Sequence, residues 1–233
     1  MQKTALRWTV DLTHPVRAGF GDVPGHPQTE IVPIHTHQNH GRSNAALTTS
    51  IHAGTHLDAP FHFFAGGQTI DRVDIPRLCG RAVLLDMTGI CRAGRGLTSG
   101  DILSALVGAG IADPTGWRLI FRSGWERLYG TPEYYRNNPH LTAGAAEWLA
   151  RAGVPLVGLD FPPDFIGEKM SVPAPAPVHL ALLGAGVCIL ENLARLGDLP
   201  SAVFDLLCLP LRLEGEGGAP ARVIALQRGD DSP

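Results

Sequence analysis

Short runs of Val, Ile, Leu and other apolar residues recur along the whole chain, and Gly, Pro and polar residues separate them. Runs of this length and composition favour strands over helices. We expect eight strands, over Trp8–Leu12, Glu30–Ile34, Ala82–Met87, Arg118–Phe121, Pro155–Asp160, Val187–Glu191, Phe204–Leu213 and Ala221–Gln227. A stretch rich in Gly and Glu, residues 214–220, separates the last two and predicts a hairpin loop.

Helix signals are fewer and stand between the predicted strands. Three helices are expected: from a cap at Thr98 to about Gly108, from a cap at Thr142 to Arg151, and from Pro177–His179 to Gly184–Gly186. Strands at both ends with helices interspersed are typical of an α/β fold. Because no linker or repeat interrupts the pattern, we expect one domain over residues 1–233, with a mixed β-sheet.

The composition is that of a globular protein, since 44% of the residues are apolar and 18% are charged. A chain of 233 residues buries about 70% of its unfolded surface, so it needs no disulfide or structural metal merely to fold. The four cysteines form no CxxC pair. This favours small core residues in a reduced, cytoplasmic protein.

The charge pattern disfavours two classes of partner. The net charge is −3 and the basic residues are scattered, so the chain shows neither the basic stripe of a nucleic-acid-binding protein nor a polybasic membrane anchor. The N-terminus lacks the apolar run of a signal peptide, and no apolar stretch is long enough to cross a bilayer. The pattern therefore indicates neither a nucleic acid nor a membrane as the partner and leaves a small-molecule partner open.

Histidines are concentrated in one part of the chain, where six of the ten lie between His35 and His62. The last three of these, His52, His56 and His62, share an eleven-residue segment with Asp58. Imidazole nitrogens and a carboxylate are ligands that suit Zn²⁺ or Mn²⁺. We therefore predict that this segment holds a transition metal.

Neither regular structure brings these ligands together. On a straight strand His52 and His56 would lie ~13 Å apart, at about 3.3 Å per residue, which is too far for bonds of about 2.1 Å to one ion. A helix is disfavoured by Gly54, Thr55 and Pro60. The segment is therefore predicted to curl as an irregular loop at the end of a strand, with Gly54 at the turn.

Two non-enzymatic interpretations are open at this point. The segment can be a His-rich surface hairpin in a structural subunit, or the protein can bind a metal or small molecule without turnover. The second interpretation requires a blocked pocket or a missing acid/base group, whereas His62 stands just beyond Pro60 as a candidate acid or base. The other three histidines of the region, His35, His37 and His40, are expected to decorate a hairpin.

The segment resembles the HxGTHxDxPxH motif of the metal-dependent cyclase superfamily, which includes bacterial kynurenine formamidases and isatin hydrolases. Seven fixed positions are matched within eleven residues: His52, Gly54, Thr55, His56, Asp58, Pro60 and His62. The likeness extends along most of the chain. Further stretches that resemble the family are Asp11–Pro15, Tyr134–Pro139, Val157–Asp160 and His179–Glu191.

The resemblance implies a role for each matched polar residue. The implied ligands of a first ion are His52, His56 and Asp58, and those of a second ion are Asp58, His179 and Glu191. His62 would be the catalytic acid/base. The resemblance also implies a swivelling β/β/α fold, one or two Zn²⁺ or Mn²⁺ ions as cofactor, and a homodimer or higher homo-oligomer.

The same resemblance implies hydrolysis of a C–N bond other than a peptide bond, in an aryl formamide such as N-formylkynurenine or in a cyclic amide. A metal-activated water would attack the carbonyl, and His62 would transfer the proton to the leaving nitrogen. Phe61, Phe63 and Trp125 are candidates for walls around an aromatic or cyclic substrate. The run Phe161–Asp164 replaces the polar run with Ser or Thr expected of a kynurenine formamidase, so an isatin-hydrolase-like or lactone-opening activity is the alternative.

Overall fold

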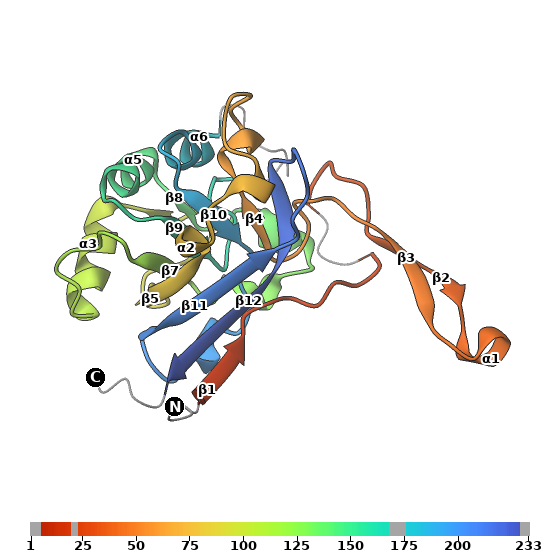
Figure 1. Cartoon of the computed structure of the whole chain (residues 1–233). Coiled ribbons are helices and arrows are strands. Elements are labelled where there is room, and N and C mark those ends of the chain that lie inside the picture. Colours follow the sequence, from red (N-terminus) through yellow and green to blue (C-terminus); the bar gives the residue numbers. More distant parts are fainter. Residues whose placement is uncertain (1–5, 20–22, 168–175, 229–233) are drawn as a thin grey trace.

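The computed structural model describes residues 6–19, 23–167 and 176–228 of the chain (Figure 1). Its strands are β1 (Leu6–Asp11), β2 (Glu30–His35), β3 (Asn44–Thr48), β4 (His56–Asp58), β5 (Cys79–Asp86), β6 (Gly96–Leu97), β7 (Arg118–Arg122), β8 (His140–Leu141), β9 (Leu156–Leu159), β10 (Cys188–Glu191), β11 (Val203–Pro210) and β12 (Gly218–Arg228). Its α-helices are α1 (His37–His40), α2 (Ile75–Leu78), α3 (Ser99–Gly108), α4 (Pro132–Tyr135), α5 (Ala143–Arg151) and α6 (Pro177–Gly184). Short 3₁₀ turns cover Pro60–His62, Ile70–Arg72, Trp125–Leu128 and Leu196–Asp198.

Within these residues, seven strands form a closed barrel in the order β12–β11–β5–β7–β9–β10–β4, and β4 pairs with β12 to close the ring. The strands β5, β7, β9 and β10 run parallel to their neighbours in that series. The pairings of β4, β11 and β12 are antiparallel. β1 also pairs antiparallel with β12, along the residues that follow the β4 pairing. The sheet is therefore mixed and the fold is α/β, as the sequence predicts.

Alternate residues of the barrel strands face two separate apolar clusters. On β7 the side chains of Leu119 and Phe121 join a cluster with residues of α3, α5 and α6, whereas Ile120 joins the cluster inside the barrel. The three helices cover one side of the sheet (Figure 1). Because both faces of the central strands are buried, the strands read as continuous apolar runs. No helix in this described part of the chain is long and apolar enough to cross a membrane.

The predicted strands and helices are confirmed, with ends that shift by no more than about three residues. Thr98 caps α3 through a reciprocal pair of hydrogen bonds with Asp101. Thr142 caps α5 by accepting a hydrogen bond from the Ala145 amide. Of the predicted hairpin loop, residues 214–217 lie between the antiparallel strands β11 and β12, whereas residues 218–220 already belong to β12.

The prediction of an irregular loop is wrong for His56–Asp58, which form the short strand β4. A three-residue strand leaves no local pattern, because its pairing partners come from distant parts of the chain. β4 pairs with β10 on one side and with β12 on the other. The predicted turn at Gly54 is confirmed, since its φ is +69°.

The strands β2 and β3 form an arm, residues 30–48, that projects away from the barrel (Figure 1). They pair with each other and with no other described strand. The large apolar side chains of the arm are 42–55% exposed: Ile31, Val32, Ile34 and Leu47. The histidines predicted to decorate a hairpin lie at its outer end: His35, His37 and His40.

Candidate metal centre

The turn at Gly54 brings the two ends of the histidine segment together. Its backbone lies in the left-handed region, which glycine adopts without strain. The next residue, Thr55, donates its hydroxyl to the Asn192 carbonyl at 2.6 Å and so fastens the turn to the end of β10. The rings of His52 and His56 consequently meet edge to face, with centroids 5.3 Å apart.

Alternation along β4 places His56 and Asp58 on one face, while Leu57 enters the barrel core. All three are almost fully buried, with exposed fractions of 2% or less. β12 passes so close that a Cβ atom at Gly218 would lie 2.7 Å from His52 Cε1 and 2.8 Å from the Leu57 carbonyl oxygen. Because Gly218 has no side chain, β12 can pair with β4 and close the barrel.

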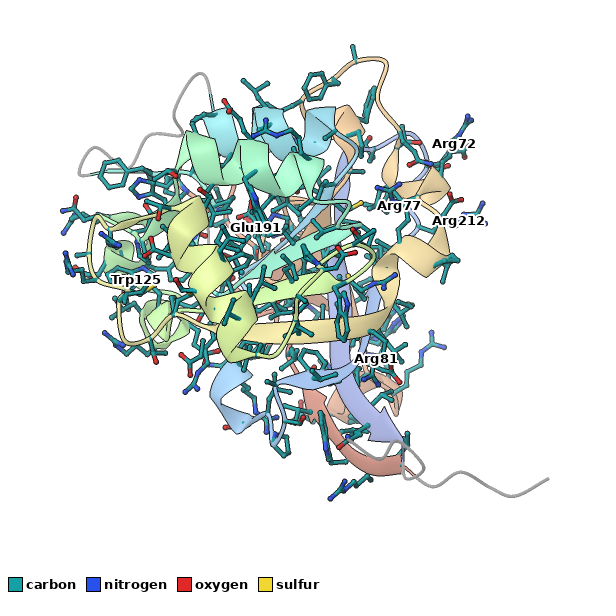
Figure 2. The ribbon with its side chains drawn as sticks, turned by 90° about the vertical axis from the view of Figure 1, so that its left-hand side faces the viewer. Arg72, Arg77, Arg81, Trp125, Glu191 and Arg212 are labelled. Carbon is teal, nitrogen blue, oxygen red and sulfur yellow. The ribbon has the colours of Figure 1, made fainter. Side chains whose placement is uncertain are left out.

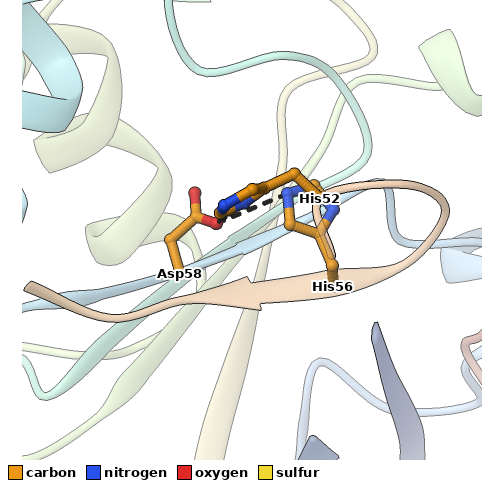
Figure 3. A group of neighbouring side chains, drawn as sticks. All are labelled: His52, His56 and Asp58. Atoms are coloured by element: carbon orange, nitrogen blue, oxygen red, sulfur yellow. Dashed lines mark hydrogen bonds and ion pairs between the residues drawn. The ribbon is translucent and has the colours of Figure 1, made fainter. Parts of the chain in front are cut away.

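Ligand atoms of His52, His56 and Asp58 lie within 4.8 Å of one another (Figure 3). His52 Nδ1 is 2.7 Å and His56 Nε2 is 3.5 Å from Asp58 Oδ1. His56 donates its Nδ1–H to the Gly54 carbonyl at 2.8 Å. That bond sets the tautomer of His56 and leaves the Nε2 lone pair turned toward Asp58, as a metal ligand requires.

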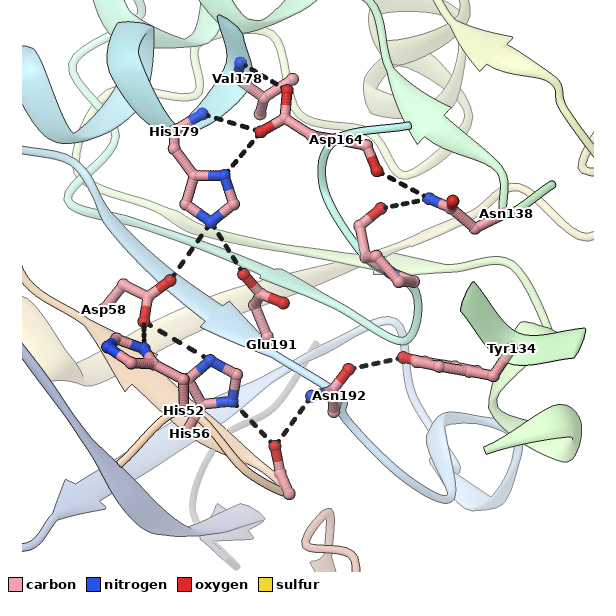
Figure 4. A network of polar contacts seen from close by, with 12 residues as sticks. His52, His56, Asp58, Tyr134, Asn138, Asp164, Val178, His179, Glu191 and Asn192 are labelled. Carbon is pink, nitrogen blue, oxygen red and sulfur yellow. Dashed lines mark hydrogen bonds and ion pairs between the residues drawn. The ribbon is translucent and has the colours of Figure 1, made fainter. Parts of the chain in front are cut away.

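His179 and Glu191 approach the other oxygen of Asp58 from α6 and β10 (Figure 4). His179 Nε2 lies 3.5 Å from Asp58 Oδ2 and 3.1 Å from Glu191 Oε1. Glu191 is the register partner of His56 across the β10–β4 pair. The sheet therefore brings the far end of the sequence to the histidine segment.

His62 lies at the edge of both groups of ligand atoms. It ends the 3₁₀ turn after β4, and its ring stacks on His52 with centroids 3.9 Å apart. One of its nitrogens lies within 4.8 Å of ligand atoms of Asp58 and His179. The structure thus gathers every residue that the sequence proposes as a ligand or as the acid/base.

The buried acceptors of this cluster fit a cation. Within the described residues, Asp58 Oδ2 is buried and has no hydrogen-bond partner. An unpaired buried polar atom costs about 1–3 kcal/mol, and more when it is charged. His179 Nε2 and Glu191 Oε1 point to the same place. A divalent ion would satisfy Asp58 Oδ2 and would take His179 Nε2 and Glu191 Oε1 as further ligands, since nitrogen and carboxylate donors are its usual ligands.

The electrostatics of the cluster favour an ionised Asp58. Burial alone would raise the pKa of Asp58, but the adjacent rings of His56 and His52 outweigh it and hold the pKa well below its usual range. Burial is the main reason that the pKa of His62 falls to about 4, so this ring is neutral at pH 7. Burial also opposes charge on His179, yet the neighbouring carboxylates of Asp164, Asp58 and Glu191 raise the pKa of His179 well above its usual value in the metal-free cluster.

Sequence reasoning does not identify two residues that hydrogen-bond to the candidate ligands or to the Gly54 turn beside them, Asp164 and Asn192. Asp164 accepts the Nδ1–H of His179 at 2.6 Å. Asn192 donates its amide to the Gly54 carbonyl at 2.9 Å and accepts the Tyr134 hydroxyl at 2.7 Å (Figure 4). Their local signals are weak: Asp164 ends an apolar run and Asn192 merely follows a ligand candidate.

A cavity of about 150 Å³ opens onto the ligands. Its apolar and aromatic lining comprises Val23, Phe63, Tyr135, Pro162, Pro163 and Ile166. Of the three residues predicted as substrate walls, Phe63 lines this cavity and Phe61 and Trp125 do not. Trp125 is 8% exposed in the hydrophobic core, where it donates to the Tyr134 carbonyl. Figure 2 places Trp125 near one edge of the molecule and Glu191 near its middle.

A closed mixed barrel that gathers imidazoles and carboxylates around a buried, unpaired carboxylate oxygen defines a metal-dependent enzyme, with a divalent metal as its cofactor. Comparison with known proteins narrows this class. The Cyclase family model matches residues 10–163, which is more than half of the chain. The chain belongs to the Cyclase family.

Individual relatives agree with this family. Kynurenine formamidase of Bacillus mycoides (strain KBAB4) is 29% identical over 218 residues, which cover 92% of this chain and 95% of that protein. The structure of isatin hydrolase A from Labrenzia aggregata bound to benzyl benzoate superposes with a TM-score of 0.82 and 25% identity, covering 94% of this chain and 93% of that one. A predicted metal-dependent hydrolase from Bacillus stearothermophilus gives a TM-score of 0.73 and 27% identity, covering 94% and 98%. The predicted resemblance and fold class are confirmed.

Proposed function

We propose that this protein hydrolyses a C–N bond in a small aromatic or cyclic amide, at a metal held by His52, His56 and Asp58. The observation that carries the proposal is the convergence of buried nitrogen and oxygen acceptors on Asp58. The kynurenine formamidase and the isatin hydrolase among the similar proteins support a hydrolase of formamides or cyclic amides.

The donor set suits Zn²⁺ or Mn²⁺, both of which accept imidazole and carboxylate ligands. A divalent ion held there would polarise the substrate carbonyl and lower the pKa of a bound water to about 7. A second ion is proposed between Asp58, His179 and Glu191, because the two oxygens of Asp58 face different ligand groups.

His62 is the proposed proton carrier. Its ring borders the cavity beside His52, and its exposed fraction is larger than that of the buried ligand candidates His56 and Asp58. It accepts the proton of the attacking water as the C–O bond forms, and donates that proton to the nitrogen as the C–N bond breaks. Phe63 packs edge-on against His62, with ring centroids 4.7 Å apart, and so limits the movement of the ring.

The shape and chemistry of the cavity favour a compact, uncharged substrate. Its volume of about 150 Å³ is below the ~300 Å³ at the low end of typical ligand pockets. Its described lining residues include no Lys or Arg that would pair with the α-carboxylate of an amino-acid substrate. We therefore propose a cyclic amide such as isatin ahead of N-formylkynurenine. The latter is the second candidate, on the strength of the formamidase relatives.

Purified protein is expected to carry Zn²⁺ or Mn²⁺, and to open isatin with a kcat/KM at least ~10-fold higher than for N-formylkynurenine, which corresponds to about 1.4 kcal/mol. Elemental analysis measures the metal content. Absorbance assays measure the hydrolysis of isatin, of N-formylkynurenine and of a simple lactone. Chelation should abolish turnover and either ion should restore it. Absence of stoichiometric metal, with no binding after either ion is added, would contradict the proposal.

His179→Ala is expected to lower the metal content from two ions towards one per chain while the first ion stays in place. The reason is that His179 contributes to the second ligand group alone. Isothermal titration of the metal-free protein gives the stoichiometry and both dissociation constants. A single ion in both proteins would instead indicate a mononuclear enzyme.

We propose further that the protein is a homodimer joined through the arm of residues 30–48. An isolated two-stranded hairpin is marginally stable in water, and this one exposes Ile31 and Ile34 by 42% and 53%. Beside its base lies a cavity of about 430 Å³ with Val16, Leu47 and Leu211 in its wall. An exposed apolar arm and an apolar cavity on one chain are features that a two-fold symmetric pair can cover twice.

The double variant Ile31→Ser/Ile34→Ser is expected to sediment as a monomer where the unmodified protein sediments as a dimer, because apolar burial drives such an interface. Val107→Ser is the control, since Val107 is 76% exposed on α3 and far along the chain from the arm. Analytical ultracentrifugation distinguishes the two states. A dimer in the double variant, or a monomer in the unmodified protein, would contradict the assignment.

A further inference from the structure

Asp164 is a buried carboxylate that the chemistry described above does not use. Its exposed fraction is 2%. Oδ1 accepts the backbone N–H of Val178 at 2.9 Å, and Oδ2 accepts the backbone N–H of His179 at 3.3 Å and its ring Nδ1–H at 2.6 Å. The ring contact is the shortest of the three (Figure 4).

The loop that carries Asp164 is held independently of His179. Asn138, which is fully buried, donates its amide to the carbonyls of Asp164 at 2.8 Å and Pro162 at 3.1 Å. Its own carbonyl accepts the Ile166 amide at 2.9 Å. The backbone on both sides of Asp164 is therefore anchored, and the carboxylate is a fixed acceptor for His179.

A fixed acceptor at Nδ1 decides which nitrogen of His179 carries the proton. With Nδ1–H donated to Asp164, the lone pair of a neutral ring is on Nε2, which faces Asp58 and Glu191. Phe63 stacks on the ring, with centroids 4.9 Å apart and planes 24° apart, and limits its rotation. Asp164 and Phe63 therefore set the orientation of the His179 ring, and Asp164 also sets which ring nitrogen carries the proton.

We infer that Asp164 is a positioning residue, which sets the tautomer and orientation of His179 and thereby the affinity of His179 for metal. The inference rests on the proposed metal centre and adds a residue to it. Asp164 lines the edge of the cavity, but its carboxylate bonds to Val178 and His179, so it acts on the metal centre through His179.

Asp164→Asn separates this role from packing, because the two side chains have nearly the same shape. If the amide oxygen keeps its bond with Val178 N–H, the NH₂ group faces His179 Nδ1 and forces the ring proton onto Nε2, toward the ion. If the side-chain amide instead rotates by about 180°, its NH₂ group faces the Val178 N–H, and α6 loses this hydrogen bond at its N-terminus. The first arrangement removes a ligand without a change of fold.

The metal-free variant is expected to bind the ion that depends on His179 about 10–100-fold more weakly, with the other ion unchanged. Isothermal titration with Zn²⁺ measures both constants for the unmodified protein, Asp164→Asn and His179→Ala. The ¹⁵N-histidine spectrum of the zinc-loaded unmodified protein is expected to contain a His179 Nδ1–H signal that both variants lack. Asp164→Glu keeps a carboxylate and is expected to bind within about tenfold of the unmodified protein.

The matched control is Asp101→Asn, the same substitution at the N-terminus of α3, where Asp101 accepts the Thr98 amide at 2.8 Å. It is expected to lose stability and keep both metal constants. Unchanged constants in Asp164→Asn, alongside loss of an ion in His179→Ala, would overturn the inference and leave the proposed function standing. Unchanged metal content in His179→Ala would overturn the second ion and the inference together.

Discussion

Replacement of His56 by alanine is expected to strip the metal from the protein, whereas the same replacement at His62 is expected to leave the metal in place and lower kcat by about 10²–10⁴-fold. The two changes are chemically identical, so different outcomes can come only from position. His56 is 2% exposed and turns Nε2 toward Asp58. Without it, the remaining ligands no longer close the coordination shell.

His62 tests the division between ligand and proton carrier most directly, because one of its nitrogens also lies within 4.8 Å of ligand atoms of Asp58 and His179. The measurements are metal content by elemental analysis and steady-state kinetics with the preferred substrate. Loss of metal from His62→Ala would make His62 a ligand and leave proton transfer to another group. Full activity together with full metal content would remove it from the mechanism.

Gly218→Ala is expected to lower kcat/KM by about 10²-fold, because an added methyl group must displace the metal ligands. The new Cβ would stand 2.7 Å from His52 Cε1 and 2.8 Å from the Leu57 carbonyl oxygen. The histidine can rotate away only by leaving Asp58, and the carbonyl belongs to β4 itself. The overpacking is expected to cost about 1–3 kcal/mol of folding stability in addition.

Gly89→Ala is the matched control, since a Cβ atom at Gly89 meets no heavy atom within 4 Å. It should leave metal affinity, kinetics and the midpoint of thermal unfolding near those of the unmodified protein. Calorimetric titration and differential scanning calorimetry of both variants provide the comparison. If Gly218→Ala binds metal as tightly as the unmodified protein, β12 moves away from β4 to accommodate the added methyl group, and the prediction is wrong.

The central barrel strands β7, β9 and β10 could be predicted because strands that are buried on both faces have continuous apolar runs. β4 could not, because its three residues are polar at both ends and its pairing depends on segments more than a hundred residues away. One of the two arm strands could be predicted. Glu30–Ile34 is rich in β-branched residues, whereas Asn44–Thr48 contains two alanines between polar ends and does not resemble a strand.

The part of the candidate site that lies within the histidine motif could be predicted from the sequence. His52, His56, Asp58 and His62 are close in sequence, and family resemblance added His179 and Glu191. The residues that orient them required coordinates. Asp164 reaches across 15 positions to His179, and Asn192 reaches across 138 positions to the Gly54 carbonyl. Of the three aromatic residues expected around the substrate, only Phe63 lines the cavity, because aromatic residues serve cores as readily as pockets.

The shortest strand of the barrel, β4, is also the one that closes it, between β10 and β12. Three residues supply few backbone hydrogen bonds, so the seam is a natural place for local opening. Asp58 lies on β4 and Glu191 on the adjacent strand β10, so the proposed second cation, held between them, would tie these two strands together. A free-ion concentration 100 times the dissociation constant would add about 2.7 kcal/mol to the free energy of unfolding. Removal of the metal by chelation would then loosen the pairing of β4 as well as abolish catalysis. The rate of amide hydrogen exchange along β4 would report the occupancy of the metal centre.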